Sequence, residues 1–261
     1  MRLAGKPTLL WGVSILAVLT SSVGTAQESD LRAIVERDGT VVLCLARGQI
    51  LFADRCSGTG RLSIVQPIQE GEVVWRSAIG TITIENESPQ NSNCALSRAK
   101  WNPKDEQAVL SGKTIRVLDP AWVLAQLDKK LPGLTDLTEG DFTAFALDLD
   151  NDGRDEIVFS ASNIERLEKL NEKTGQTYPY VVMGGILQGS SRFPRNFYFE
   201  QGTYAGGTDA IGDVSFKGVV SIAADDIALL VVSGNTFRGL QDLIRFRDDV
   251  QRIETIQRRC D

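Results

Sequence analysis

The sequence predicts a mainly β protein, built as a small antiparallel β assembly with one or two short helices. From residue 40 onward, apolar and polar residues alternate over short segments, which is the pattern of half-buried strands. Segments rich in Gly, Ser, Asn and Asp interrupt this alternation, as at 57–60 and 86–93, and they carry the residues that turns require. At 261 residues the chain is long enough to bury a core in one large or two small domains.

The first expected strands follow one another closely after residue 40. Their ranges are 40–45, 49–52, 61–65, 72–75 and 80–84. They define a β-rich N-terminal region over residues 27–112, and a second β region is expected over residues 113–261.

Two helices are expected in the second region. Asp119 is an N-cap residue and Pro120 suits the first helical position, while Leu-Pro-Gly at 131–133 ends the helix. A second, solvated helix is expected over 164–173, and Gly175 ends it. The strands expected around these helices are 142–147, 156–160, 178–182, 196–200, 214–222, 227–232 and 243–246. The Gly-rich segment 202–212 predicts a mobile loop.

The first 26 residues resemble an export signal. Arg2 and Lys6 give a basic start, an uncharged run covers 7–26, and Gly-Thr-Ala at 24–26 is a small-residue cleavage site. We expect cleavage before Gln27 and a periplasmic or secreted protein; an uncleaved anchor is the alternative. No other segment is long and apolar enough to cross a membrane, so no transmembrane segment is expected after cleavage.

Charge and composition exclude several function classes. After signal removal, 34 acidic side chains face 26 basic ones, which argues against a nucleic-acid partner because phosphate binding needs basic clusters. The chain contains no histidine, which excludes Ser-His-Asp and Cys-His catalysis and zinc sites that use imidazole.

The four cysteines predict a disulfide-stapled protein. An even number of cysteines in an exported chain usually forms disulfides, and three pairings are open. Cys44–Cys56 is favoured because the two residues flank a short strand–turn–strand segment, and Cys94–Cys260 would then join the end of the chain to its first half. Four buried thiols are the alternative.

The segment 148–156 carries five carboxylates in nine residues and predicts a cation site. Alternation along the loop directs Asp148, Asp150 and Asp152 inward, and Gly153 permits the bend that lets Glu156 close the ring. Hard oxygen ligands at this spacing suit Ca²⁺. The alternative is a solvated hairpin, since Asn-Asp-Gly is ordinary turn chemistry.

This loop departs from the EF-hand pattern. An EF-hand needs Glu at its twelfth position, where this chain has Phe159, and flanking helices where this chain predicts strands. The segment Phe-Ala-Leu-Asp-Leu-Asp-Asn-Asp-Gly-Arg-Asp-Glu-Ile-Val-Phe, residues 145–159, instead resembles the calcium hairpin of FG-GAP/VCBS repeats, which occur in integrin-like propellers and bacterial surface proteins.

The resemblance implies a ligand set and a repeat. The ligand positions of the family fall on Asp148, Asp150, Asp152, the carbonyl group of Arg154, and Glu156. Asp155 matches no ligand position and is expected to point outward. One clear repeat covers about 140–160, and a decayed copy without ligands covers about 215–256. A propeller needs several such repeats, so the resemblance implies an assembly of VCBS-like hairpins and not a full propeller.

The segment Ser-Gly-Lys-Thr, residues 111–114, looks like the end of a phosphate-binding loop. The first glycine of that motif would fall at Gln107, so the loop is absent and the segment predicts a turn.

The favoured function is an exported, non-catalytic, calcium-stabilised module that interacts with a protein or glycan at the cell envelope. An alternative is a hydrolase that uses the metal or a carboxylate pair, since glycosidases work with two acids and no histidine. Candidate acids outside the cation loop are Glu200, Asp209, Asp213, Asp225 and Asp226. A third possibility is an inhibitor or subunit of an envelope complex.

Overall fold

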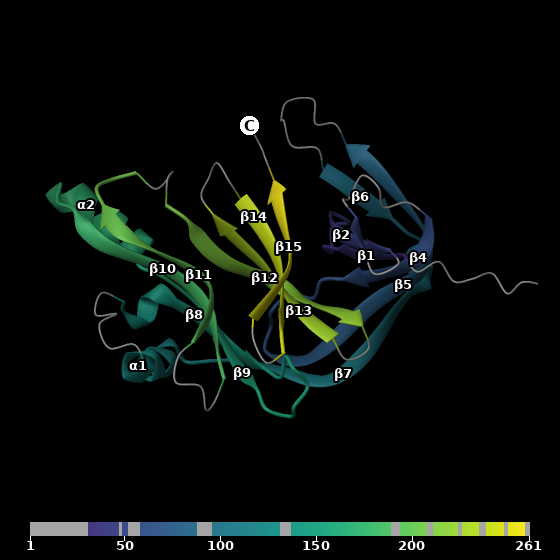
Figure 1. The fold of residues 1–261 in the computed structure, drawn as a ribbon, viewed down its shortest axis with the longest axis horizontal. Coiled ribbons are helices and arrows are strands. Elements are labelled where there is room, and N and C mark those ends of the chain that lie inside the picture. The colour runs from purple at the N-terminus through teal and green to yellow at the C-terminus, as the bar shows by residue number, and fades with distance from the viewer. Residues whose placement is uncertain are drawn as a thin grey trace, which may run out of the picture.

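The computed structural model describes residues 31–46, 49–51, 58–87, 96–130, 137–188, 194–207, 211–223, 226–234, 239–247 and 250–258. Within these ranges the chain is mainly β, as predicted, with two α-helices and two open sheets (Figure 1). The predicted signal segment lies outside the described residues, and so do Cys56, Cys94 and Cys260. Cys44 is fully buried, but the favoured pairings stay predictions.

The larger sheet has eleven strands, which run across most of the chain. In chain order they are β1 (Leu31–Val35), β2 (Val41–Ala46), β3 (Gln49–Leu51), β4 (Gly58–Ile64), β5 (Gly71–Glu87), β6 (Leu96–Lys100), β7 (Glu106–Val117), β8 (Phe142–Leu147), β9 (Glu156–Ser162), β10 (Tyr178–Leu187) and β11 (Arg195–Tyr204). Their order in the sheet is β11-β10-β9-β8-β7-β5-β4-β1-β2-β3, with β6 paired to β5. Every neighbouring pair is antiparallel except β1 and β4, which are parallel, so the antiparallel expectation is wrong at this one pair.

Strand β5 joins the two halves of this sheet. The expected strands 72–75 and 80–84 form one 17-residue strand, because the residues between them include no Gly, Pro, Asn or Asp and pairing continues through them. The N-terminal part of β5 pairs with β7 and its central part with β4.

Strands β1, β6 and β7 were not among the expected strands. In β7 only Ile115 is buried, so the strand has no apolar alternation that could mark it in the sequence. Pairing with β5 on one side and β8 on the other holds it in the sheet. The expected boundary between residues 112 and 113 therefore lies inside a strand that bridges both regions.

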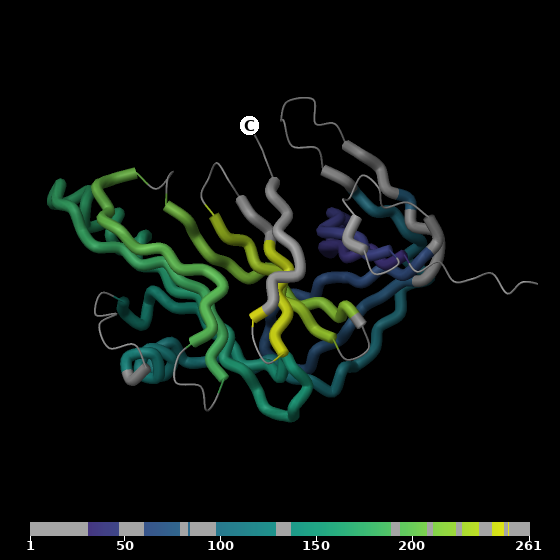
Figure 2. The backbone as a smooth tube through the Cα atoms, viewed as in Figure 1, coloured from purple at the N-terminus to yellow at the C-terminus, as the bar shows by residue number. Residues whose placement is uncertain are grey.

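The smaller sheet contains four antiparallel strands in the order β12-β13-β14-β15. They are β12 (Asp213–Ala223), β13 (Asp226–Gly234), β14 (Gly239–Phe246) and β15 (Val250–Arg258). The larger sheet curves around it, as the backbone tube also shows (Figures 1 and 2). Strand β13 is apolar from Ile227 to Val232 because both of its faces pack against the larger sheet.

Two core clusters lie on opposite faces of the smaller sheet. Leu229 and Val231 pack in a cluster with Phe145 and Val158 of the β8–β9 hairpin. Ala228 and Leu230 face the other way and pack in a cluster with residues of β1 and β2, including Ile34, Val42 and Leu43. The smaller sheet therefore packs between the β8–β9 hairpin on one face and strands β1 and β2 of the larger sheet on the other.

One close backbone approach connects the two sheets. Gln66 N donates to Val219 O at 2.7 Å, and Val219 N donates to Gln66 O at 2.8 Å. Gly218 makes this approach feasible, because a Cβ atom there would overlap the carbonyl oxygen of Gln66.

Both predicted helices are present. Helix α1 (Pro120–Lys130) begins as expected, with Asp119 Oδ1 accepting from Ala121 N at 2.9 Å, and its predicted end at 131–133 lies outside the described residues. Val123 and Leu127 bury α1 in a third core cluster with residues of β8, β9 and β10. Helix α2 (Ile164–Thr174) ends at Gly175, which has φ 66°. Short 3₁₀ turns cover Pro103–Asp105 and Glu139–Asp141. Among the described helices, none has the length and apolar character needed to span a bilayer.

Candidate metal centre

The acidic loop connects β8 to β9 at a rigid position. The last residue pair of the hairpin is Leu147 with Glu156, so the loop begins directly beyond two paired strands. Leu147 and Val158 are fully buried in the central core and fix the base of the hairpin. Asn151 at φ 66° and Gly153 at φ 84° turn the chain back, which matches the bend expected at Gly153.

Three of the predicted ligand side chains converge. Asp148, Asp150 and Glu156 each offer one carboxylate oxygen, and these oxygens lie within 4.8 Å of one another. Glu156 is fully buried, whereas Asp148 and Asp150 are half-buried. Asp152 lies beside them in the loop, where its Oδ1 accepts from Arg154 N at 2.8 Å. Asp152 and Arg154 thus lie next to the cluster in the chain but outside the group of three converging carboxylates.

Each of the two most enclosed carboxylates has one fixed oxygen and one without a partner. Asp148 Oδ2 accepts from Lys113 Nζ at 2.9 Å and from Gly153 N at 3.3 Å, and Glu156 Oε2 accepts from Leu149 N at 2.8 Å. Asp148 Oδ1 and Glu156 Oε1 are buried and have no hydrogen-bond partner among the residues that the structure describes. Buried polar atoms are almost always satisfied, so these two oxygens are available to accept from or coordinate a ligand.

Electrostatics favour a positive ligand at this position. Burial, together with the nearby charges of Asp150, Asp152 and Asp148, raises the pKa of Glu156 to about 7. Burial also raises the pKa of Asp150, with contributions from Asp152 and Asp148. Without a cation, the cluster therefore retains a proton up to neutral pH.

Lys113 of β7 belongs to this site although the sequence did not identify it. Its Nζ also donates to the carbonyl oxygen of Asp148 at 2.8 Å, from 35 residues away in the sequence. The segment 111–114, expected to be a turn, is a bulge in β7: Leu110 and Thr114 pair with β5 and the three residues between them do not. Gly112 has φ 69° within this bulge. No local pattern marks Lys113, because its role depends on strand pairing.

A second cation of β7 binds the far end of the loop. Arg116 forms an ion pair with Asp155 Oδ2 at 2.5 Å, outside the three converging carboxylates. This agrees with the expectation that Asp155 points away from the ligand set. Lys113 and Arg116 thus attach both ends of the loop to one strand.

The donor set fits a hard divalent cation. All of its side-chain ligands are carboxylates, and the described cluster includes no thiol or imidazole. Calcium takes six to eight oxygen ligands in flexible geometry, whereas magnesium requires a near-ideal octahedron. One buried and two half-buried carboxylates make up this donor set.

The acids named for the hydrolase alternative have separate partners. Glu200 accepts from Tyr180 Oη at 2.8 Å and from Tyr198 Oη, and Asp226 forms an ion pair with Arg245 at 2.7 Å. Asp209 and Asp225 lie outside the described residues. Asp213 borders a surface hollow that lies between the two sheets. Glu200 Oε2 also accepts from Gly212 N at 3.2 Å, so Glu200 lies near Asp213, and its oxygens are already bound by two tyrosines and this amide.

Comparison with known proteins gave no relative. No family model, no curated protein and no solved structure matches the chain. The likeness to the FG-GAP/VCBS hairpin rests on the motif at 148–156 and on its position between two antiparallel strands.

Proposed function

We propose that this protein is an exported, non-catalytic module of the FG-GAP/VCBS type, stabilised by one Ca²⁺ bound in the β8–β9 loop. The ligands are Asp148, Asp150, Asp152, the carbonyl group of Arg154, and Glu156. The observation that carries the proposal is the pair of buried oxygens without a described partner, Asp148 Oδ1 and Glu156 Oε1, in a cluster of three carboxylates. A divalent cation would satisfy both oxygens and offset the burial and the repulsion that together raise the pKa of Glu156.

The bound cation has a structural role in this proposal. The loop leaves a hairpin whose inner face packs on the smaller sheet, and Lys113 and Arg116 join it to β7. A cation that binds only the folded state stabilises that state in proportion to the logarithm of its concentration over Kd. Extracellular sites of this kind have a Kd on the order of 10⁻⁴–10⁻³ M.

The rigid scaffold would present its loops to a protein or glycan partner at the cell envelope. The basic start and uncharged run of residues 1–26 support export, and the acidic balance of the mature chain opposes a nucleic-acid partner. Because the ligand set uses several fixed protein oxygens, it resembles a closed structural site more than an open catalytic one.

The test is thermal unfolding of the exported, oxidised chain 27–261, with millimolar Ca²⁺ and with a chelator. We expect calcium to raise the unfolding midpoint by several degrees, and Asp150→Ala to abolish that gain. Magnesium at the same concentration should give a smaller gain, because the site has no octahedral constraint.

A matched control separates ligation from loop charge. Asp155→Asn removes one negative charge from the same loop at a residue that pairs with Arg116 and not with the cluster. It should keep the calcium gain. An unchanged midpoint with calcium in the unmodified protein would show that the acidic run is a solvated turn and would refute the proposed function.

A further inference from the structure

A hollow of about 440 Å³ lies where the end of β7, the first turn of α1 and the β8–β9 hairpin meet. Its volume is in the range of small-molecule sites. None of the three converging carboxylates lines it, so it is separate from the proposed cation site, although Asp155 of the acidic loop borders it.

Strand register places the floor of this hollow in one row across three strands. Arg116 of β7 lies opposite Ala146 of β8, and Ala146 lies opposite Ile157 of β9. Residues directly opposite each other in antiparallel strands point to the same face, with Cβ atoms about 4.5–5.5 Å apart. Ala146 has the smallest side chain of the three, which leaves space at the centre of the row. Three strands at a spacing of about 4.8 Å give a floor roughly 10 Å wide.

One side of the hollow carries exposed apolar surface. Trp122, in the first turn of α1, is 46% exposed, and Val117, at the end of β7, is 55% exposed. Because Val123 and Leu127 of the same helix are fully buried, α1 is fixed against the sheet and the indole ring is held in place. An aromatic ring held in this way presents an open face to a ligand.

The charges at the rim of the hollow are balanced. Arg116 donates to Asp155 Oδ2 from Nε at 3.1 Å and from Nη2 at 2.5 Å. Asp119 caps α1 and lies at the positive end of its dipole, which offsets the charge of this carboxylate. A rim in which each charge is offset favours a neutral ligand. The ion pair still offers Asp155 Oδ1 as an acceptor and Arg116 Nη1 as a donor.

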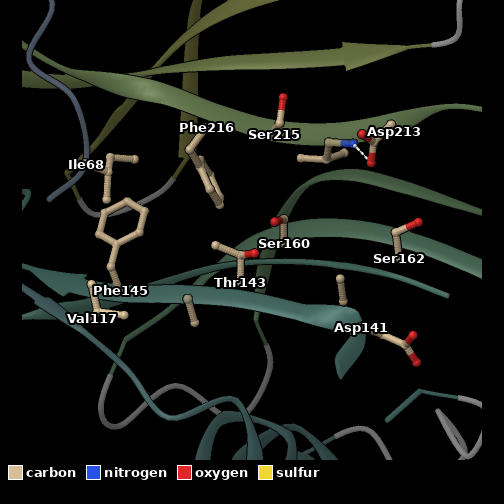
Figure 3. A pocket seen from close by; sticks show the side chains of 13 residues that line it. Ile68, Val117, Asp141, Thr143, Phe145, Ser160, Ser162, Asp213, Ser215 and Phe216 are labelled. Carbon is tan, nitrogen blue, oxygen red and sulfur yellow. Dashed lines mark hydrogen bonds between the residues drawn. The ribbon is translucent and has the colours of Figure 1, made fainter. Parts of the chain in front are cut away.

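The hollow between the two sheets has no such aromatic surface. Figure 3 shows Phe145 and Phe216 at one end of it, and their rings meet edge to face with centroids 5.4 Å apart. Phe145 is only 1% exposed, so its face is closed to a ligand. Of these two hollows, only the one at α1 combines an open aromatic face with a fixed donor and acceptor.

We propose that the hollow at α1 binds a neutral pyranoside with equatorial hydroxyl groups. One face of the sugar ring would stack on the indole of Trp122, and Arg116 and Asp155 would bind its hydroxyl groups. The C–H bonds on that face are weakly positive and suit the negative face of an aromatic ring. Hydroxyl groups both donate and accept, which matches a guanidinium and a carboxylate at one rim. This assignment rests on the proposed function, which includes a protein or glycan partner, and it names the glycan.

A proline-rich peptide is the competing ligand for an exposed tryptophan. Such peptides dock in grooves lined by aromatic side chains. Trp122 is the only aromatic residue that the described part of the chain contributes to this hollow, and the charged pair beside it suits hydroxyl groups better than proline rings. The observations therefore favour the saccharide.

The test is a calorimetric titration of the mature chain 27–261, in millimolar Ca²⁺, with cellobiose, sorbitol and a tetraproline peptide. Cellobiose has flat ring faces and equatorial hydroxyl groups, whereas sorbitol has hydroxyl groups and no ring. We expect saturable binding of cellobiose, and binding of sorbitol that is weaker by roughly tenfold or more. Absence of cellobiose binding, or equal affinity for sorbitol, would overturn the assignment. Tighter binding of tetraproline would assign the hollow to a peptide instead.

Matched substitutions place the ligand in the hollow. Trp122→Ala should weaken cellobiose binding by roughly tenfold or more, and Trp122→Phe should weaken it less because an aromatic face remains. Phe199→Ala is the control, since Phe199 of β11 is also a half-exposed aromatic residue, at 49%, but lies outside the hollow. An unchanged affinity in Trp122→Ala, or equal losses in Trp122→Ala and Phe199→Ala, would overturn the assignment.

The saccharide and calcium tests fail separately. Asp155→Asn should weaken cellobiose binding by roughly threefold to tenfold, because a neutral amide accepts more weakly than a carboxylate, while the calcium gain is retained. A calcium gain without cellobiose binding would overturn the saccharide site alone. Cellobiose binding that depends on Trp122, without a calcium gain, would refute the calcium site alone.

Discussion

The ammonium nitrogen of Lys113 lies 2.9 Å from Asp148 Oδ2 and 2.8 Å from the carbonyl oxygen of the same residue. Lys113 of β7 therefore binds both the main-chain carbonyl group and the carboxylate of Asp148, which is the first acid of the loop. Both side chains are largely enclosed, at 12% and 17% exposure, so water screens this ion pair less than a surface pair. The Asp148 oxygen that Lys113 leaves free is one of the two buried oxygens of the cluster that have no described partner.

Replacing Lys113 should make the protein depend more strongly on calcium. Lys113→Met keeps the apolar stem and removes the charge, which leaves Asp148 with less compensation in the cation-free protein. We expect a loss of about 1–3 kcal/mol without calcium, with a midpoint lower by roughly 2–4 °C for each kcal/mol. Calcium should recover most of this loss, so the calcium-induced gain becomes larger than in the unmodified protein.

Arg116→Met is the control for this prediction. It removes the other cation that β7 contributes to the hairpin, but its side chain is 59% exposed and its ion pair is open to solvent. Thermal unfolding should show a change below about 1 kcal/mol and an unaltered calcium gain. Equal effects of the two substitutions would show that Lys113 has no special relation to the cation.

Stability without calcium should fall as the pH rises. The pKa of Glu156 is about 7 in the folded protein and near 4.5 when the chain is unfolded, so between these values the folded state holds a proton that the unfolded state has released. Glu156 therefore contributes stability at acidic pH that is lost as the pH passes through 7. Unfolding midpoints in chelator from pH 5 to 8 measure this, and Glu156→Gln should remove the decline.

Calcium affinity, in contrast, should increase as the pH rises. The cation must displace the proton of Glu156, so binding tightens as the pH rises from about 6 to 8 and releases protons. Calorimetry in two buffers with different ionisation enthalpies counts the released protons. A dissociation constant that stays the same over this interval would contradict the assignment of Glu156 as a ligand.

Gly153→Ala should destabilise the bend of the loop, whereas Asn151→Gly should not. Gly153 has φ 84°, and a Cβ atom added there would meet no other atom within 4 Å, so Gly153→Ala introduces backbone strain without a steric clash. We expect a loss of about 1–2 kcal/mol together with weaker calcium binding. Asn151→Gly, at φ 66°, is the counterpart and should leave both the stability and the calcium gain nearly unchanged.

A side chain at position 218 should destabilise the backbone contact between the two sheets. A Cβ atom there would overlap the carbonyl oxygen of Gln66, which accepts from Val219 N. Gly218→Ala should therefore cost about 1–3 kcal/mol in denaturant unfolding. Gly140→Ala, where the nearest atom is 4.0 Å away, should have little effect and serves as the control.

The hairpin and the carboxylate cluster could be predicted from the sequence because both depend on local features. The strand expected at 142–147 agrees with β8, and β9 begins at Glu156 as expected. The alternation of apolar and polar residues and the turn residues between them, within about twenty residues of sequence, are sufficient to predict such a hairpin. The convergence of Asp148, Asp150 and Glu156 depends on the same short loop.

The remaining features depend on partners far along the chain. The alternation rule does not apply to β7, in which only Ile115 is buried, and Lys113 reaches the site only because β7 lies beside β8. The parallel pairing of β1 with β4 and the hollow between the sheets likewise arise from tertiary arrangement. No period or motif in a single sequence encodes these relationships.

The burial of β13 on both faces has a kinetic consequence. On each side of the smaller sheet, the larger sheet presents apolar residues that the strands of the smaller sheet cover. The two clusters around the smaller sheet therefore cannot form until β12 to β15 are available. Contacts between such distant segments slow folding, typically to milliseconds or seconds. The smaller sheet and the two clusters around it therefore assemble only after these late strands have been synthesised.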